Sequence, residues 1–202
     1  MNISLLDPIG AGCSILATYY FTQARSCAFP ISLFAIGINS ILYFQKGIYA
    51  HLGLEAIYVV SSVYGWYCWS TQTGVQLMPA TRFITRMPIL TKIVFGVLAV
   101  ISIPLLALGL QTCTDSDVPY WDATTTLLAL LAQWMLCKKW IECWAIWFVV
   151  DALVAILHWA KGIPFHSVTH LFYLGMAVVG YLKWRKMMER DTSGIPPSTS
   201  IF

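Results

Sequence analysis

Charged residues are scarce in this chain of 202 residues. Lys, Arg, Asp and Glu make up only 10% of it, whereas apolar residues make up 58% and the mean hydropathy is +0.71. Ordinary soluble domains contain roughly a quarter charged residues. The chain therefore has too few charged residues to cover a soluble domain, and the composition predicts a polytopic membrane protein.

The sequence also lacks the motifs of nucleotide, metal and nucleophile chemistry. It contains no Gly-rich phosphate loop and no nucleophile elbow, and its six cysteines show no CxxC or Cys/His ligand spacing. We therefore predict no catalytic residue, no metal ligand and no cofactor.

The net charge of +3 comes from basic residues between and after the apolar runs, so no nucleic-acid partner is expected. No basic region precedes the first apolar run, which predicts a retained first span and no cleaved signal peptide.

Seven apolar stretches are long enough to cross a bilayer, which takes about 20 residues. Short connections between several of them predict antiparallel neighbours, and the one sizeable loop lies between residues 70 and 89. The last residues, 191–202, have the composition of a disordered tail. The predicted spans are 4–22, 27–45, 49–69, 90–110, 120–137, 140–160 and 164–184.

The basic residues predict the orientation of the chain. If the N-terminus lies outside, ten Lys and Arg residues fall on the inner side and two on the outer side. Cytoplasmic loops carry the excess of Lys and Arg, so an outer N-terminus and a cytoplasmic C-terminus are predicted. The inner set is Arg25, Arg82, Arg86, Lys92, Lys138, Lys139, Lys183, Arg185, Lys186 and Arg190, and the outer set is Lys46 and Lys161.

An internal repeat gives the strongest architectural signal. Residues 42–70 align without a gap with residues 157–185, at an offset of 115, and nine positions are identical. Two copies in the same orientation need a linking helix between them. We therefore predict an all-α membrane protein whose seven transmembrane helices are arranged three plus one plus three as a parallel repeat. The predicted parts are a first three-helix bundle (1–70), a loop and linking helix (71–119), a second bundle (120–190) and the tail.

The sixth predicted span carries a carboxylate among tryptophans. Trp140, Trp144, Trp147, Asp151 and His158 share one helical face, and an ionised group at membrane depth costs at least about 2.5 kcal/mol. Indoles beside a buried acid suit a flat, cationic, aromatic ligand. The alternative is that the tryptophans pack helices together and the acid pairs with a neighbouring helix. The residues alone leave both interpretations open.

Two further carboxylates, Glu55 and Asp122, lie within predicted spans away from the inner interface, and no Lys or Arg occupies such a position. Each must be protonated, hydrogen-bonded or opposite a cationic ligand. In the repeat, Glu55 corresponds to His170 and Asp151 corresponds to Ile36. Residues of a duplicated scaffold should recur in both copies, so this difference favours a functional role for the two acids. Glu142 is different: a local ion pair with the neighbouring lysines at positions 138 and 139 is expected for it.

Three sequence elements occur together in this chain. They are Trp140, Glu142, Trp144, Trp147 and Asp151 at one place, Pro119 to Asp122 at another, and Ile48 to Ala50 leading to Tyr64, Gly65, Trp66, Tyr67 and Trp69. With these elements the chain resembles the PnuC family of bacterial vitamin transporters, over about Asp7 to Trp184. The resemblance implies a seven-helix fold like that of a full-length SWEET sugar transporter. It also implies facilitated uptake of nicotinamide riboside across the bacterial inner membrane, driven by a cytoplasmic kinase that phosphorylates and traps the substrate. Related branches carry thiamin or riboflavin.

The resemblance also implies substrate-binding residues on three spans. This chain has Asp151 where the family usually has Asn, and Glu55 where it usually has Gln. Ionised acids only accept hydrogen bonds, so a cationic ligand with several donors is favoured, either nicotinamide riboside or thiamin, and neutral riboflavin fits least. The implied residues are Glu55, Tyr58 and Ser62, then Trp121, Asp122 and Thr125 or Thr126, then Trp144, Trp147 and Asp151.

Several alternatives remain at the level of the sequence. One is proton-coupled transport of the same ligand, with Glu55 or Asp151 as the proton carrier. A membrane enzyme or receptor is disfavoured because no nucleophile–base pair is visible, and a non-transporting scaffold is disfavoured by the buried acids. The expected partners are a small cationic vitamin or nucleoside, the lipid bilayer and the kinase, and a homo-oligomer is left open.

Overall fold

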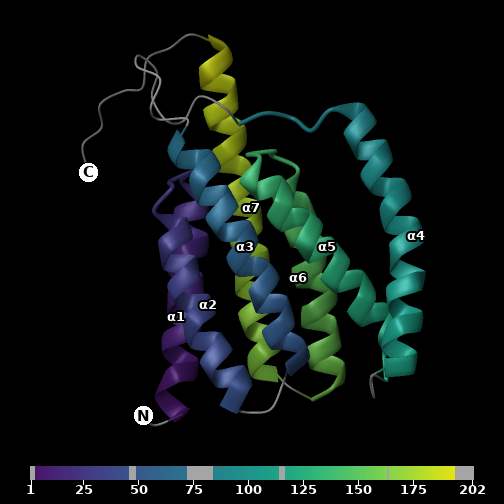
Figure 1. The fold of residues 1–202 in the computed structure, drawn as a ribbon. Helices are drawn as coiled ribbons and strands as arrows, with labels where there is room; N and C mark the ends of the chain where they lie inside the picture. The colour runs from purple at the N-terminus through teal and green to yellow at the C-terminus, as the bar shows by residue number, and fades with distance from the viewer. Residues whose placement is uncertain (1–2, 46–48, 72–83, 114–116, 163, 194–202) are drawn as a thin grey trace.

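A computed structural model describes the chain except for residues 1–2, 46–48, 72–83, 114–116, 163 and 194–202. The regular structure of the described residues is entirely helical (Figure 1). The seven helices are α1 (Ile3–Thr22), α2 (Ala28–Gln45), α3 (Tyr49–Thr71), α4 (Ile89–Cys113), α5 (Pro119–Cys137), α6 (Cys143–Ala160) and α7 (Pro164–Ser193).

Each helix coincides with a predicted span to within a few residues, with two exceptions. Helix α6 begins at Cys143, because the backbone just before it pairs with the segment ahead of α4: Thr85 N–H donates to Lys139 O (3.1 Å) and Ile141 N–H donates to Thr85 O (3.0 Å). Helix α7 continues to Ser193, three residues into the predicted tail. The rest of that tail lies outside the described residues, as do the Lys-Gly-Ile turn at 46–48 and most of the loop between residues 70 and 89.

The helices pack as two sequential sets of three. Helix α2 packs between α1 and α3, and α6 packs between α5 and α7; the sets then meet where α1 contacts α7 and α3 contacts α5. Helix α4 stands at one edge of the molecule, and among the described residues α5 is the only helix that it contacts (Figure 1). We call α1–α3 the first set and α5–α7 the second set.

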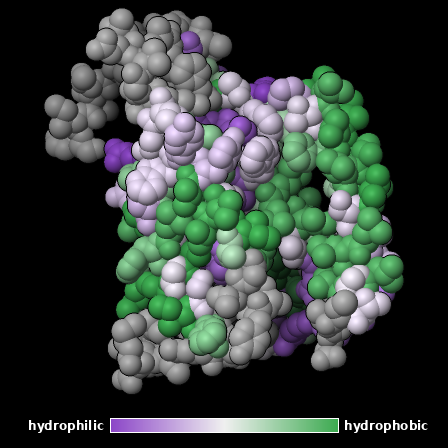
Figure 2. Space-filling view, viewed as in Figure 1, coloured by the Kyte–Doolittle hydropathy of each residue, from purple (hydrophilic) through white to green (hydrophobic). Residues whose placement is uncertain are grey.

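The surface of α4 is apolar along its length. Large side chains such as Val100, which is 73% exposed, point away from the bundle and form a hydrophobic column at that edge (Figure 2). Within the described residues, the segments Ile89–Thr112 and Cys143–Ala160 are long and apolar enough to cross a membrane. Such a surface is stable against lipid, whereas it would be costly against water.

Two tryptophans join the sets at the end of the molecule where α5 meets α6. Trp69 in α3 donates its indole N–H to Cys137 O at the end of α5 (3.0 Å), and Trp184 in α7 donates to Phe21 O at the end of α1 (3.0 Å). Both indoles are almost fully buried. Trp69 and Trp184 are equivalent positions of the sequence repeat, so each set satisfies a terminal carbonyl of the other in the same way.

A glycine and an aromatic ring make the second matched contact. A Cβ atom at Gly65 would lie 2.5 Å from the Phe29 ring, and a Cβ atom at Gly180 would lie 2.5 Å from the Trp144 ring. These positions too are related by the offset of 115 residues. In both sets the ring of the middle helix therefore packs directly on the backbone of the third helix, and only glycine leaves it room.

Glu142, which immediately precedes α6, ties the start of α4 to the bundle. Its carboxylate accepts a hydrogen bond from Met87 N–H (3.0 Å) and pairs with Lys92 Nζ (2.7 Å). The predicted partners were wrong: Lys138 Nζ instead donates to the Tyr64 hydroxyl, and Lys139 lies over an indole ring. Glu142 pairs with a lysine 50 positions away and not with its sequence neighbours, because the turn before α6 directs those lysines toward the aromatic residues of α3 and α5.

Glu142 should make the stability of the protein sensitive to acid. Partial burial raises the pKa of this carboxyl, but the hydrogen bonds from Lys92 and Met87 outweigh it, so the net pKa lies below the ordinary value of 4.5. Because the pKa is lower in the folded protein, the ionised carboxylate stabilises the fold at pH values above its ordinary pKa. This stabilisation is lost as the pH falls through the folded-state pKa. We expect Glu142→Gln to cost about 1 kcal/mol of unfolding free energy at pH 7 and much less at pH 3, measured by denaturant unfolding in detergent. Glu189→Gln, which removes an exposed pair with Arg185, is the control and should show a smaller difference.

Candidate functional site

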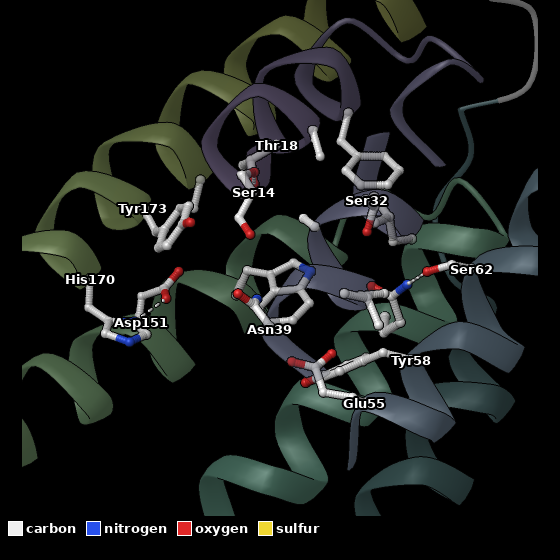
Figure 3. Close-up of a pocket in the computed structure, with 18 of the residues that line it drawn as sticks. Ser14, Thr18, Ser32, Asn39, Glu55, Tyr58, Ser62, Asp151, His170 and Tyr173 are labelled. Atoms are coloured by element: carbon white, nitrogen blue, oxygen red, sulfur yellow. Dashed lines mark hydrogen bonds and ion pairs between the residues drawn. The ribbon is translucent and has the colours of Figure 1, made fainter. Parts of the chain in front are cut away.

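A cavity of about 380 Å³ lies inside the bundle, between the two sets of helices. All helices except α4 contribute to its wall, and its volume falls in the range of small-molecule sites, about 300–1,000 Å³. Figure 3 shows its polar side chains converging from α1, α2, α3, α6 and α7. The lining residues are Ser14, Ala17, Thr18, Phe21, Ser32, Ala35, Ile36, Asn39, Glu55, Tyr58, Ser62, Gln133, Leu136, Trp144, Trp147, Asp151, His170, Tyr173 and Ala177.

Six of the nine residues assigned to the site from the sequence line this cavity. The structure brings together Glu55, Tyr58 and Ser62 from α3 with Trp144, Trp147 and Asp151 from α6.

The three residues from the start of α5, namely Trp121, Asp122 and Thr126, are not among the lining residues. Helix α5 reaches the cavity only at Gln133 and Leu136, which lie about three to four turns beyond Asp122, so at about 1.5 Å per residue Asp122 is roughly 16 Å short of Gln133. The Trp121 indole instead donates to Leu153 O (3.2 Å), a contact that packs α5 on α6. A role of these three residues in binding stays a prediction.

Asp151 lies in the cavity wall with a histidine partner. Its Oδ1 is 2.9 Å from His170 Nδ1, and the Asp151 residue is only 6% exposed (Figure 3). Within the described part of the chain, Oδ2 has no hydrogen-bond partner. The sequence left open whether a histidine would meet this acid, and the packing of α6 on α7 settles that it does. One oxygen is thus held by the protein and the other is free to meet a ligand.

Glu55 reaches the cavity from α3, on a different wall from Asp151 (Figure 3). Tyr58, one turn along the same helix, lies next to its carboxylate in that view. Within the described residues Glu55 takes part in no ion pair or hydrogen bond. The two acids of the cavity therefore differ in kind: one has a protein partner and the other has none.

The tryptophans of α6 divide between packing and the cavity. Trp144 is 3% exposed and meets Trp184 edge to face, with the ring centroids 5.5 Å apart, while part of its surface borders the cavity. Trp147, one turn on, lines the cavity without belonging to the fully buried core. The packing interpretation therefore holds for Trp144, whereas ligand stacking stays a prediction, for which Trp147 is the best placed indole.

The two sets of helices contribute equivalent positions to the wall of the cavity. Many of its lining residues occur in pairs separated by 115 positions, so equivalent positions of both sets face the same space. Only the tyrosines are identical, so the walls are equivalent in place and different in chemistry. The pairs are Thr18 and Gln133, Phe21 and Leu136, Ser32 and Trp147, Ile36 and Asp151, Glu55 and His170, Tyr58 and Tyr173, and Ser62 and Ala177.

Sequence reasoning had not assigned several polar lining residues to the site. Ser14, Thr18 and Ser32 are small residues of apolar spans and give no signal of their own. His170 and Tyr173 were detectable, because they are the repeat equivalents of Glu55 and Tyr58. Applying the offset of the repeat to each assigned residue would have found them.

Gly180 supports one wall of the cavity through its contact with Trp144. We expect Gly180→Ala to lower stability by about 1–3 kcal/mol, because the new methyl group must displace that ring, and to weaken ligand binding in the cavity that the ring borders. Thermal unfolding and ligand titration of the purified protein measure the two effects. Gly175→Ala on the same helix is the control, since a Cβ atom there meets nothing within 4 Å. Equal behaviour of the two variants would contradict the prediction.

Comparison with known proteins matches most of the chain to a family of transporters. Residues 4–186 match the family described as nicotinamide mononucleotide transporter. The nicotinamide riboside transporter PnuC of Escherichia coli strain K12 is 21% identical over 205 residues, which cover 91% of this chain and 86% of that one. The riboflavin/roseoflavin transporter RibM of Streptomyces davaonensis is 23% identical over 150 residues, covering 71% and 70% of the two chains. The crystal structure of the vitamin B3 transporter PnuC superposes with a TM-score of 0.74 at 20% identity, over 93% of this chain and 83% of that chain, and shows the same fold.

Proposed function

The chain belongs to the nicotinamide mononucleotide transporter family, and from that premise we propose that it carries nicotinamide riboside through the bacterial inner membrane by facilitated transport. The observation that supports this substrate is the cavity, in which Glu55 and Asp151 face one space together with Trp147. No Lys or Arg occurs among the described residues that line it. Two acids with a stacking surface favour a ligand that combines a positive charge with an aromatic ring.

In this proposal each part of the substrate has a matching group. The pyridinium ring stacks on Trp147 and its charge is balanced by a carboxylate of the cavity, while the ribose hydroxyls and the amide meet hydroxyl and amide groups such as Ser62 and Asn39. The three residues at the start of α5 would meet the substrate before it reaches the cavity. Thiamin, which also joins a cationic ring to hydrogen-bond donors, is the second candidate.

Transport in this proposal is alternating access between two three-helix bundles, 1–70 and 120–190, with α4 as the link of a SWEET-like, three plus one plus three arrangement. The equivalent residues Trp69 and Trp184 make matching hydrogen bonds, and the equivalent glycines Gly65 and Gly180 make matching contacts with a ring, which supports an equivalence of the two sets. The proposed orientation has the N-terminus outside and the C-terminus in the cytoplasm. A cytoplasmic kinase would then keep uptake running by removing the free substrate.

A proton-coupled mechanism is the second candidate for the energetics. The pairing of Asp151 with His170 favours it, because an acid hydrogen-bonded to an imidazole inside a membrane bundle is an arrangement that proton relays use. Passive transport needs no such exchange. The two mechanisms differ in their response to a pH gradient.

Counterflow in liposomes tests the proposal. Purified protein, reconstituted in vesicles loaded with unlabelled nicotinamide riboside, is expected to accumulate labelled nicotinamide riboside transiently and release it chemically unchanged. Thiamin and riboflavin are tested in parallel. Accumulation that survives a protonophore supports passive transport, and accumulation abolished by it supports proton coupling. Empty-vesicle rates with all three vitamins would contradict the proposed function.

A further inference from the structure

We propose that Glu55, and not Asp151, supplies the negative charge that receives the positive ring of the substrate, which makes Glu55 the residue that selects cationic over neutral ligands. This inference rests on the proposed function and adds an orientation of the substrate within the cavity. Asp151 and His170 then act together as a hydrogen-bonding pair for the uncharged part of the ligand.

The first argument is that Asp151 already has a hydrogen-bond partner. Its Oδ1 is held 2.9 Å from His170 Nδ1. An acid that already shares a hydrogen with an imidazole has less charge to offer a second cation. The pair is a donor and acceptor unit fixed between two packed helices, α6 and α7.

The second argument is the isolation of Glu55. Among the described lining residues, α1 offers hydroxyls, α2 offers Asn39, α5 offers Gln133, and α3 adds Tyr58, none of which carries a positive charge. The titratable groups of α6 and α7 in the wall are those of Asp151, His170 and Tyr173, and the imidazole is turned to Asp151. Glu55 therefore has no basic group in the described wall. A carboxylate withdrawn from bulk water is destabilised unless a cation compensates its charge, and the proposed substrate is a cation that enters this space.

The third argument comes from the equivalence of the two sets. Positions 151 and 170 of the second set are an acid and a histidine in contact, whereas the same positions of the first set are Ile36 and Glu55. The first set thus has one acid, and the position that would hold a partner for this acid is an isoleucine. The asymmetry gives the cavity one wall with an uncompensated charge and one wall with a neutralisable pair, which orients a ligand that is charged at one end only.

The test compares two ligands that differ in charge and little in shape: nicotinamide riboside and its reduced dihydro form, in which the added hydride removes the positive charge. We expect Glu55→Gln to weaken binding of nicotinamide riboside roughly tenfold or more, the loss expected for one hydrogen-bonded charge, and to change binding of the reduced form by less than about twofold. Asp151→Asn should weaken both ligands by similar factors. Isothermal titration of detergent-purified protein measures both.

Glu189→Gln, which removes the same charge from an exposed site on α7, is the control and should leave both affinities unchanged. Glu55→Asp keeps the charge and should keep the preference for the cationic ligand, so it guards against a general loss of folding. Equal losses for both ligands in Glu55→Gln, or a charge-selective loss in Asp151→Asn, would overturn the inference. Failure of the wild-type protein to bind either ligand, or thiamin in their place, would instead refute the proposed function.

Discussion

Replacing Trp69 or Trp184 with alanine is expected to lower the free energy of unfolding by about 3–5 kcal/mol, the usual cost of removing a buried aromatic side chain. These two indoles are the largest fully buried side chains of the described residues. Each packs between the two sets of helices and also makes a hydrogen bond across them. Loss of either one should therefore loosen the junction between the sets as well as the local packing.

Replacing each of these tryptophans with phenylalanine keeps an aromatic ring and removes the hydrogen bond, so it separates the two contributions to stability. Trp69→Phe leaves Cys137 O without its indole donor and should cost about 1–3 kcal/mol. Trp184→Phe removes one of two donors to Phe21 O, which still accepts from Ala24 N–H (3.0 Å), so a smaller loss is expected. Because the two rings lie 6.1 Å apart, the double variant is expected to deviate from additivity. Thermal and denaturant unfolding in detergent measure these differences.

The matched control is Trp159→Phe, at a side chain of α6 that is 70% exposed. This change should leave stability within about 0.5 kcal/mol, as is usual for surface positions. A loss at Trp69 no larger than at Trp159 would show that the reciprocal indole contacts do not hold the sets together. A large loss at only one of Trp69 and Trp184 would show that the sets are not equivalent at this junction.

The existence of the helices and most of their bounds were predictable from the sequence, because long apolar stretches mark them; the start of α6 and the end of α7 were not. The repeat was predictable for a different reason: matches at Lys, Gly, His and Trp are rare enough to fix its offset. That offset also fixes which cavity positions are equivalent. The structure agrees with the assignment of Glu55 and Asp151 to one site, because both residues line the cavity.

Tertiary contacts between distant segments could not be predicted. The ion pair of Glu142 with Lys92 depends on how the segment before α4 returns to the turn before α6, and nearby lysines gave a misleading signal. The start of α5 carries polar residues that resemble a binding motif, yet the helix reaches the cavity only farther along. The partner of Asp151 depends on the rotation of α7 about its axis, which no pattern in a largely apolar helix specifies.

The offset of the repeat leads to the prediction with the largest effect on binding. Ser32 in α2 is the equivalent of Trp147 in α6, and both line the cavity. Ser32→Trp would place a second indole opposite the first, in space that the substrate is proposed to fill. We expect this variant to abolish binding and transport of nicotinamide riboside. Its unfolding temperature should stay close to that of the wild type, since a cavity accepts added volume with less strain than a packed core.

Ser32→Ala is the matched control, because it removes the hydroxyl group and leaves the space open. We expect it to retain most of the binding, with a loss of no more than about 1 kcal/mol for one hydrogen bond. Isothermal titration gives the affinities, and thermal unfolding confirms that both variants fold. If Ser32→Trp is as stable as the wild type and still binds nicotinamide riboside with the same affinity, the substrate does not occupy this cavity. The site would then have to be sought elsewhere, beginning with Trp121 and Asp122 at the start of α5.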